Sequence, residues 1–287
     1  MGGLATGPPN PPDARGATAK PRRPSNSPVV PAPAATIVLL RDRPAGGIEI
    51  LLIQRHRASK FAAGDHVFPG GKIEVDDHPE DVARWCAGLD GDQAARVLGA
   101  TDGTRTALAH WTGAIREAFE EVGVLLAVAA AGGPPRVDPA KLAEYRRACQ
   151  RDHRAFWDLI RTEQLTLTTD RLAYFAHWIT PEENPLRFDV RFFAAPMPEG
   201  QAAEADDREI IGVRWLSPRE AFAAQSRGEI SLRRPTVANL KIFEGASSAA
   251  DALAGLAGRV IPTIRPRVLT GSDGKQRALL PGDPGWY

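Results

Sequence analysis

Short runs of apolar and β-branched residues indicate where the strands lie. Residues 35–40 (ATIVLL) and 48–53 (IEILLI) flank the turn-rich segment 41–47, and this pattern predicts a β-hairpin. A third extended piece, Val67-Phe68, leads into the turn Pro69-Gly70-Gly71. Strand character returns in three later segments, at 171–179, 186–194 and 210–215. The tryptophans of these later strands, Trp178 and Trp215, are interpreted as core residues.

Helical spacing of apolar residues fills most of the space between these strands. It runs from about residue 78 to 124, with breaks at Gly88 and Gly103, and again over 138–164 as one or two helices. Ser217, Pro218 and Glu220 are typical of a capped helix start, and further helices are expected near 234–244 and 247–257. Mixed strand and helix order predicts an α/β or α+β fold, with a mixed sheet sandwiched between helices.

The ends of the chain differ from its middle. The first 34 residues contain nine of the 25 prolines and almost no large apolar side chain, so they are expected to form a disordered tail. No linker divides the middle of the chain, and we expect one domain over 35–265. A Pro/Gly-rich C-terminal extension then covers 266–287, and whether it covers the substrate site is left open.

Composition narrows the class of protein. A formal charge of +1 gives no general attraction for nucleic acid or an anionic membrane, and no apolar run is long enough to span a bilayer. Two cysteines provide no disulfide framework, and the six histidines show no zinc spacing. A cytoplasmic protein with a small-molecule partner is expected, and a homodimer is left open. Any anion must then be bound by a local cluster of cations.

The segment REAFEEVG (116–123) carries the clearest chemistry. On a helix, Glu117, Glu120 and Glu121 crowd one side, where like charges repel by about 3 kcal/mol per pair at an effective dielectric near 20. Apolar residues occupy the other side. The segment is interpreted either as a solvated face with an Arg116–Glu120 pair, or as a binding site for hard Mg²⁺ or Mn²⁺.

Together with GGKIE (70–74), this segment resembles the signature of the Nudix hydrolases. That signature runs Gly, five residues, Glu, seven residues, then Arg-Glu-apolar-x-Glu-Glu-x-Gly-apolar. Gly71, Arg116 and the three glutamates match it. The resemblance implies the Nudix fold, metal ligation by Gly71, Glu117, Glu120 and Glu121, and an Arg116 that orients a neighbouring glutamate.

The first half of the signature departs from the family pattern. Its leading Glu position falls on Asp77, and residues 78–115 occupy the space that the family spans with seven, an excess of 31 residues. We expect a helical insertion over 78–113, because lengthening a closed loop costs little entropy. Its apolar residues, including Trp85, Val97 and Trp111, predict packing against the domain, and the insertion could also wall the substrate site. A coenzyme A diphosphatase branch of the family has a similar long insertion.

The segment 51–71 resembles that branch more closely. Its coenzyme A diphosphatases carry Leu-Leu-Thr-x-Arg-Ser, three residues, Arg, three residues, Gly, three residues, Phe-Pro-Gly-Gly, and every spacing is kept here. Ile53, His56 and Lys60 replace Thr, Ser and Arg. The resemblance implies substrate binding by Arg55, Arg57, Lys60, Gly64, Phe68, Gly70 and Gly71, with the cations contacting phosphates. The alternative is a plain turn beside solvent-facing basic residues.

The resemblance implies hydrolysis of coenzyme A or acyl-coenzyme A to 3′,5′-ADP and a phosphopantetheine species by a metal-activated water. A further acid is expected from the segment 204–209, where Glu209 is preferred over Glu204, Asp206 and Asp207. Arg187 and Arg191 face either ligand or solvent. Two alternatives remain open: a pyrophosphatase acting on ADP-ribose or NADH, and a non-catalytic module that senses a nucleotide.

Overall fold

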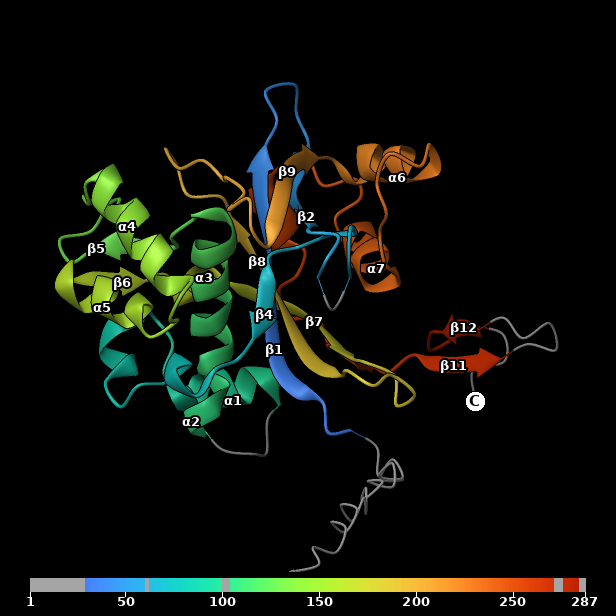
Figure 1. The fold of residues 1–287 in the computed structure, drawn as a ribbon, viewed down its shortest axis with the longest axis horizontal. Coiled ribbons are helices and arrows are strands. Elements are labelled where there is room, and N and C mark those ends of the chain that lie inside the picture. The colour runs from blue at the N-terminus through green and yellow to red at the C-terminus, as the bar shows by residue number, and fades with distance from the viewer. Residues whose placement is uncertain (1–28, 60–61, 100–103, 271–275, 284–287) are drawn as a thin grey trace, which may run out of the picture.

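A mixed sheet forms the centre of the protein. The computed structural model describes residues 29–59, 62–99, 104–270 and 276–283, and within these ranges the main sheet has eight strands (Figure 1). Strand β1 (Ala32–Asp42) is parallel to β8 (Phe188–Pro196) on one side. On its other side it pairs antiparallel with β2 (Ile48–Arg55) and β4 (Gly70–Lys72). The predicted hairpin of the first two strands is therefore confirmed.

The remaining strands extend the sheet at both edges. Strand β7 (Ala173–Ile179) pairs with β8, and the short β10 (Thr263–Ile264) pairs with β7. Strands β3 (His66–Val67) and β9 (Ile210–Leu216) both pair with β2. A small separate sheet joins β5 (Ala127–Ala129) to β6 (Leu165–Leu167).

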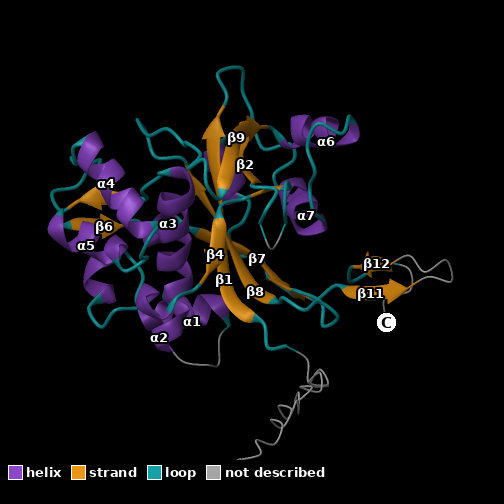
Figure 2. Cartoon of the chain, viewed as in Figure 1, coloured by secondary structure: helices purple, strands orange, loops and turns teal. Residues whose placement is uncertain are grey.

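Helices cover both faces of the main sheet, as the sequence predicts (Figure 2). Alternate residues of β1 and β2 point to opposite faces and are buried on both, which explains their continuous apolar runs. One face packs against α3 (Ala109–Val122) and α5 (Ala155–Thr162), with α4 (Pro139–Cys149) beside them. The other face packs against α6 (Pro218–Ser226), α7 (Arg234–Ile242) and α8 (Ala249–Ala254).

The boundary of the N-terminal strand differs from the expectation. Strand β1 begins at Ala32, inside the segment expected as a tail, because residues 32–34 pair with Phe188, Asp189 and Val190 of β8. Composition alone misses this pairing, since the partner strand lies more than 150 positions later in the chain. Residues 1–28 of the expected tail lie outside the described ranges.

The insertion is helical and packs at one end of α3. It contains η2 (Val82–Trp85), α1 (Gly91–Leu98) and α2 (Thr104–Ala107) and then the first turn of α3. Trp85 and Trp111 are buried as expected, but Val97 is 49% exposed, because α1 buries its Ala94/Ala95 face instead. Two further 3₁₀ turns are η1 (Val75–Asp77), just before the insertion, and η3 (Thr169–Arg171) before β7.

The C-terminal extension contains a second hairpin. Strands β11 (Arg267–Thr270) and β12 (Gln276–Leu279) pair antiparallel with each other and stand apart from the main sheet, on the side of α7 (Figure 1). In the described ranges no helix is long and apolar enough to cross a membrane. The hairpin lies on the opposite side of the sheet from the insertion, and this separation matters for the cavities described below.

Candidate active site

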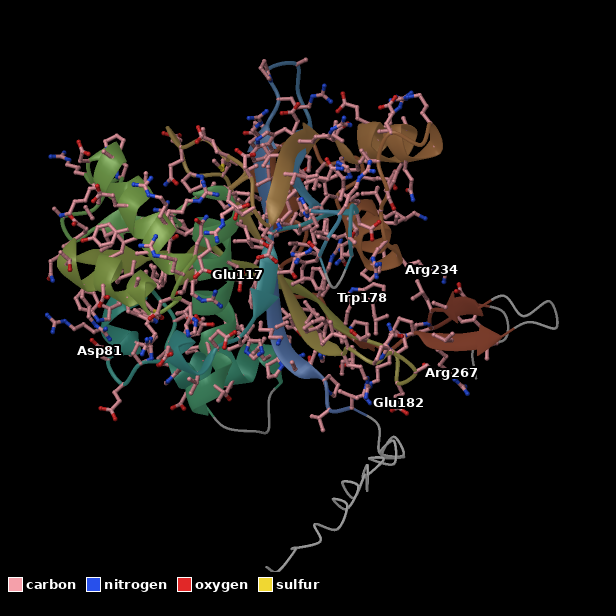
Figure 3. The ribbon with its side chains drawn as sticks, viewed as in Figure 1. Asp81, Glu117, Trp178, Glu182, Arg234 and Arg267 are labelled. Carbon is pink, nitrogen blue, oxygen red and sulfur yellow. The ribbon has the colours of Figure 1, made fainter. Side chains whose placement is uncertain are left out.

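The acidic turn of α3 lies directly against the glycine bend of β4. The backbone N–H of Gly70 donates a hydrogen bond to Glu121 Oε2 at 2.9 Å. A β-carbon on Gly71 would lie 2.4 Å from Glu117 Oε1, so any side chain at this position would displace the Glu117 carboxylate from the bend. Figure 3 shows Glu117 between α3 and β4. The expected contact between these two distant segments is therefore confirmed.

Arg116 lies inside the turn rather than on a solvated face. Its side chain is only 2% exposed and forms a two-point ion pair with Asp77, with N···O distances of 2.7 and 3.0 Å. The same guanidinium donates to Glu117 Oε1 at 2.9 Å and to Glu120 Oε2 at 3.0 Å. The expectation that Arg116 orients a neighbouring glutamate is met, and the solvated-face interpretation is wrong because the guanidinium is buried.

Asp77 is held in turn by its surroundings. Its carboxylate accepts the backbone N–H of Glu74 at 2.8 Å, and its carbonyl accepts the hydroxyl of Thr112 at 2.6 Å. A β-carbon on Gly113 would lie 2.9 Å from Asp77 Oδ2 and 2.7 Å from Ile73. Gly113 is thus the position at which α3 admits this carboxylate. A glycine within a helical pattern is the signal in the sequence for such a close approach.

The C-terminal end of α3 is fixed by side chains from α4. Gly123 ends the helix in the left-handed conformation, with φ of 73°. Arg146 donates to the carbonyls of Glu120 and Glu121 at 3.1 and 2.7 Å, and Gln150 donates to that of Glu120 at 3.0 Å. These contacts satisfy carbonyls that a helix end leaves without partners. They position the acidic turn, and the sequence pattern gave no indication of them.

The electrostatics of the turn show an excess of buried negative charge. Burial raises the pKa of Glu120 to about 8, although Arg116 opposes the shift. Burial also raises the pKa of Glu117, and it raises that of Glu121 well above its ordinary value. One buried guanidinium shared by several carboxylates therefore leaves the turn short of positive charge.

The donor set of this turn fits a divalent cation. Within the described residues, Glu120 Oε1 is buried and has no hydrogen-bond partner, as an oxygen reserved for a ligand would be. Carboxylate and carbonyl oxygens are the donors that Mg²⁺ and Mn²⁺ prefer. In those residues, no group of three or more acidic, His or Cys side chains is already arranged to hold a metal. The glutamates of the turn instead bond to the protein: Arg116 donates to Glu117 and Glu120, and Gly70 and Arg55 donate to Glu121.

Arg55 joins the turn to a later acid. Its guanidinium lies 3.4 Å from Glu121 Oε1 and 2.5 Å from Glu209 Oε1. The Glu209 carboxylate is 57% exposed, and its backbone carbonyl accepts the N–H of His56 at 2.8 Å. Glu209, the acid preferred from the sequence, therefore reaches the site through Arg55. Asp206 instead caps its own loop by accepting the backbone N–H groups of residues 208–210.

The other basic residues of the strip are placed differently. Arg57 is exposed and lies beside Gly64, which has a φ of +75°. Lys60 lies outside the described residues. Arg187 is buried and donates to the carbonyls of Thr180 and Val29, so it does not face a ligand. Arg191 bonds Asp189 and His177, which also removes it from the site.

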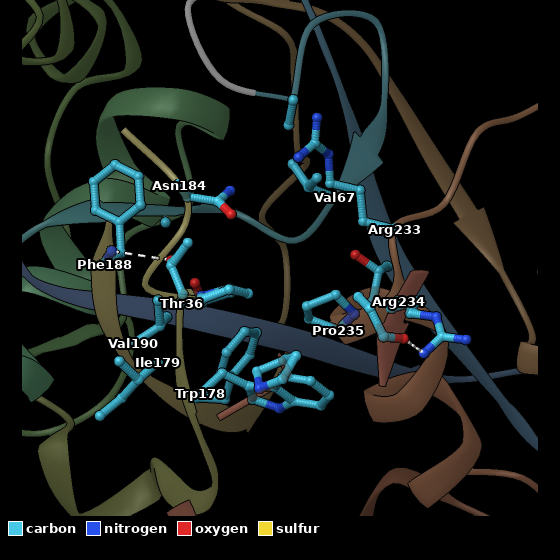
Figure 4. Close-up of a pocket in the computed structure, with 18 of the residues that line it drawn as sticks. Thr36, Val67, Trp178, Ile179, Asn184, Phe188, Val190, Arg233, Arg234 and Pro235 are labelled. Carbon is cyan, nitrogen blue, oxygen red and sulfur yellow. Dashed lines mark hydrogen bonds between the residues drawn. The ribbon is translucent and has the colours of Figure 1, made fainter. Parts of the chain in front are cut away.

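Cavities lie on both sides of Arg55 and Gly70. A polar cavity of about 440 Å³ covers the acidic turn. A second polar cavity of about 860 Å³ shares several of its lining residues and is also lined by His56 and Arg208. An apolar cavity of about 410 Å³, which includes Phe68, lies on the other side (Figure 4). None of their lining residues comes from 78–113, so the insertion does not wall these cavities.

Comparison with known proteins identifies the family of this chain. The NUDT19 Nudix domain matches residues 26–242. The chain is 30% identical over 276 residues to the acyl-coenzyme A diphosphatase NUDT19 of Homo sapiens, covering 85% of this chain and 73% of the relative. It is 30% identical over 279 residues to the protein of that name from Gallus gallus, covering 82% and 72%.

A solved structure supports the fold. The Nudix hydrolase from Alicyclobacillus acidocaldarius is 24% identical, with a TM-score of 0.66 over 78% of this chain and 96% of that chain. The family match and the diphosphatase relatives confirm the enzyme interpretation of the sequence, and they do not support the alternative of a non-catalytic module. The chain therefore belongs to the Nudix hydrolases, in the branch of enzymes that carry the NUDT19 Nudix domain.

Proposed function

We propose that this protein hydrolyses the diphosphate of coenzyme A or acyl-coenzyme A, with Mg²⁺ or Mn²⁺ as its metal. The observation that carries the proposal is the juxtaposition of the acidic turn with Arg55, the first cation of the strip 55–71. The names of the human and chicken relatives support the same substrate class. The products would be 3′,5′-ADP and phosphopantetheine or its acyl thioester.

Glu117, Glu120, Glu121 and the Gly71 carbonyl would hold the metal. When bound, a divalent cation neutralises charge on phosphoryl oxygens and lowers the pKa of water. Arg116 does not leave the turn for the substrate, because its pairing with Asp77 is buried. It acts as a positioning residue that keeps the carboxylates of Glu117 and Glu120 oriented toward the cavity.

Arg55 and Glu209 would act on the substrate itself. A guanidinium can contact two oxygens of a phosphate, and Arg55 lies in the polar cavity beside the acidic turn. The partly exposed Glu209 carboxylate lies where it can take the proton of the attacking water. The water oxygen then bonds to one phosphorus, and the bond from that phosphorus to the bridging oxygen breaks.

A substrate panel tests the proposal. The full chain would be incubated with coenzyme A, octanoyl-coenzyme A, ADP-ribose and NADH, with and without Mg²⁺ or Mn²⁺, and the products separated by chromatography. Metal-dependent formation of 3′,5′-ADP from the coenzyme A substrates is expected, and a large loss of this activity in Glu120→Gln would exclude a contaminant. Cleavage of ADP-ribose with coenzyme A left intact would overturn the proposed substrate.

A further inference from the structure

The apolar cavity has walls from three parts of the chain. The main sheet contributes Trp178, Phe188 and Val190, α7 contributes Pro235, and the C-terminal hairpin contributes Val268 and Ala278 (Figure 4). Its volume of about 410 Å³ lies in the ordinary range of small-molecule pockets. In Figure 3, Trp178 and Arg234 lie on the far side of β4 from Asp81 of the insertion.

This cavity begins where the polar cavity ends. Thr36, Arg55 and Gly70 line both, so a ligand whose diphosphate lies at Arg55 can extend one end into each. The two ends of a coenzyme A thioester differ in the same way as the cavities. The nucleoside end carries a 3′-phosphate, whereas the acyl end carries no charge.

Three polar side chains that line the apolar cavity have partners within the protein. Arg233 pairs with Asp65 at 2.5 Å, and the Thr180 hydroxyl accepts the backbone N–H of Phe188 at 3.0 Å. Arg234 donates to the carbonyl of Ala278 and lies 3.4 Å from Asp283 Oδ2. A charged guest would have to displace these contacts, whereas an apolar chain would not.

Arg234 also explains how the hairpin becomes a wall. It is the first residue of α7, and its contact with Ala278 joins the helix to β12. Asp283 accepts the backbone N–H of Leu280 at 2.9 Å, which fixes the chain just after the strand. Val268 and Ala278 are paired across the hairpin and both line the cavity.

We propose that the apolar cavity binds the acyl chain of the substrate, and that the β11–β12 hairpin sets the longest chain accepted. This inference rests on the proposed function and deepens it. Each methylene buried in the cavity should raise kcat/KM by up to about fourfold, the equivalent of about 0.8 kcal/mol. The rise should stop when the chain reaches the hairpin.

The test fills the cavity from the hairpin. Val268→Trp and, independently, Ala278→Trp would be compared with Leu269→Trp, a matched control on the same strand at a residue that is 42% exposed and does not line the cavity. The readout is the ratio of kcat/KM for octanoyl-coenzyme A to that for free coenzyme A. Both cavity variants should lower this ratio tenfold or more, and the control should stay within twofold of the unmodified enzyme.

A second measurement separates this inference from the proposed function. Calorimetry with S-octanoyl-pantetheine, which has no diphosphate, reports on the cavity even if coenzyme A is not hydrolysed. If the unmodified protein binds this compound and both cavity variants abolish the binding, the acyl site is supported even when coenzyme A is not hydrolysed. Absence of binding to the unmodified protein, or an unchanged ratio in both variants, would overturn the acyl site. An equal loss on both substrates would also overturn it, since the cavity would then bind a part common to both.

Discussion

The polar and apolar cavities meet at Arg55 and Gly70 but are held by different means. The polar cavity is built on α3 and β4, where buried ion pairs fix the side chains within the main fold. The apolar cavity takes part of its wall from a hairpin outside the main sheet, joined to α7 through Arg234. In the proposed enzyme, the reacting groups therefore lie on rigid elements of the main fold, whereas substrate selection is assigned to an appended hairpin.

The largest expected effect concerns the acidic turn. Glu120→Gln keeps the size of the side chain but removes the charge needed to hold a cation. We expect kcat to fall by about 10²–10³-fold, since a bound metal contributes several kcal/mol to the transition state. Glu204→Gln, at an exposed loop acid outside the cavities, should retain full activity. Equal activity of the two variants would contradict the assigned site.

The next effect concerns the stability of the same side of the molecule. Asp77→Asn leaves the buried Arg116 without its two-point partner, and removing one member of a buried pair costs about 3–5 kcal/mol. Denaturant unfolding should show this loss. Asp152→Asn, which breaks the exposed pair with Arg154, serves as the control and should leave the midpoint unchanged. A stability loss no larger than that of the control would show that the Asp77–Arg116 ion pair does not stabilise the fold.

The pH dependence of the protein's stability should change with a substitution in the polar cavity but not with one in the apolar cavity. The pKa of Glu120 rises from 4.5 to about 8 on folding, so its stabilising contribution is complete below pH 4.5 and is lost as pH rises toward 8. In chelator, Tm should therefore fall by a few degrees between pH 5 and 8. Glu120→Gln should reduce this slope without removing it, because burial also raises the pKa of Glu117 and Glu121, and Val268→Trp should keep the full slope. An unchanged slope in Glu120→Gln would show that another group causes it.

The smallest expected effect compares two arginines of the strip. Arg55 lines both cavities, whereas Arg57 is exposed beside Gly64. Arg55→Ala should lower kcat/KM for coenzyme A by about tenfold or more, the equivalent of at least 1.4 kcal/mol for a lost contact to a charged group. Arg57→Ala should change it by less than twofold. The reverse order would reassign the phosphate contact.

Local patterns in the sequence predict much of this fold. The hairpin of the first strands, the capped start of α6 at Ser217 and the acidic turn all follow from residue spacing within a few positions. Ser217 shows why: its hydroxyl accepts the N–H of Glu220 three residues later, so both partners lie in one short window. The family signature also brought Gly71 and Glu117 together, although 46 positions separate them.

Contacts between distant segments without a motif could not be predicted. The support of α3 by Arg146 and Gln150 depends on how α4 packs, and no local spacing encodes this. The same holds for Val268, whose place in the apolar cavity depends on Arg234. Val97 was expected to be buried but is exposed, because α1 packs its alanine face against the core. Hydrophobicity alone does not predict which face of a short helix is buried.

The Asp77–Arg116 ion pair has a consequence for the lengths that the inserted segment can have. The two residues that border the extra segment are tied to each other, and the Thr112 hydroxyl bonds the Asp77 carbonyl at the same place. The part of this segment ahead of α3 is therefore a closed loop whose two ends are held together at its base, whereas Ala109 to Ile115 belong to the helix itself. Insertions or deletions ahead of Ala109 should therefore leave the Asp77–Arg116 pair in place, because a change in the length of a closed loop costs little entropy.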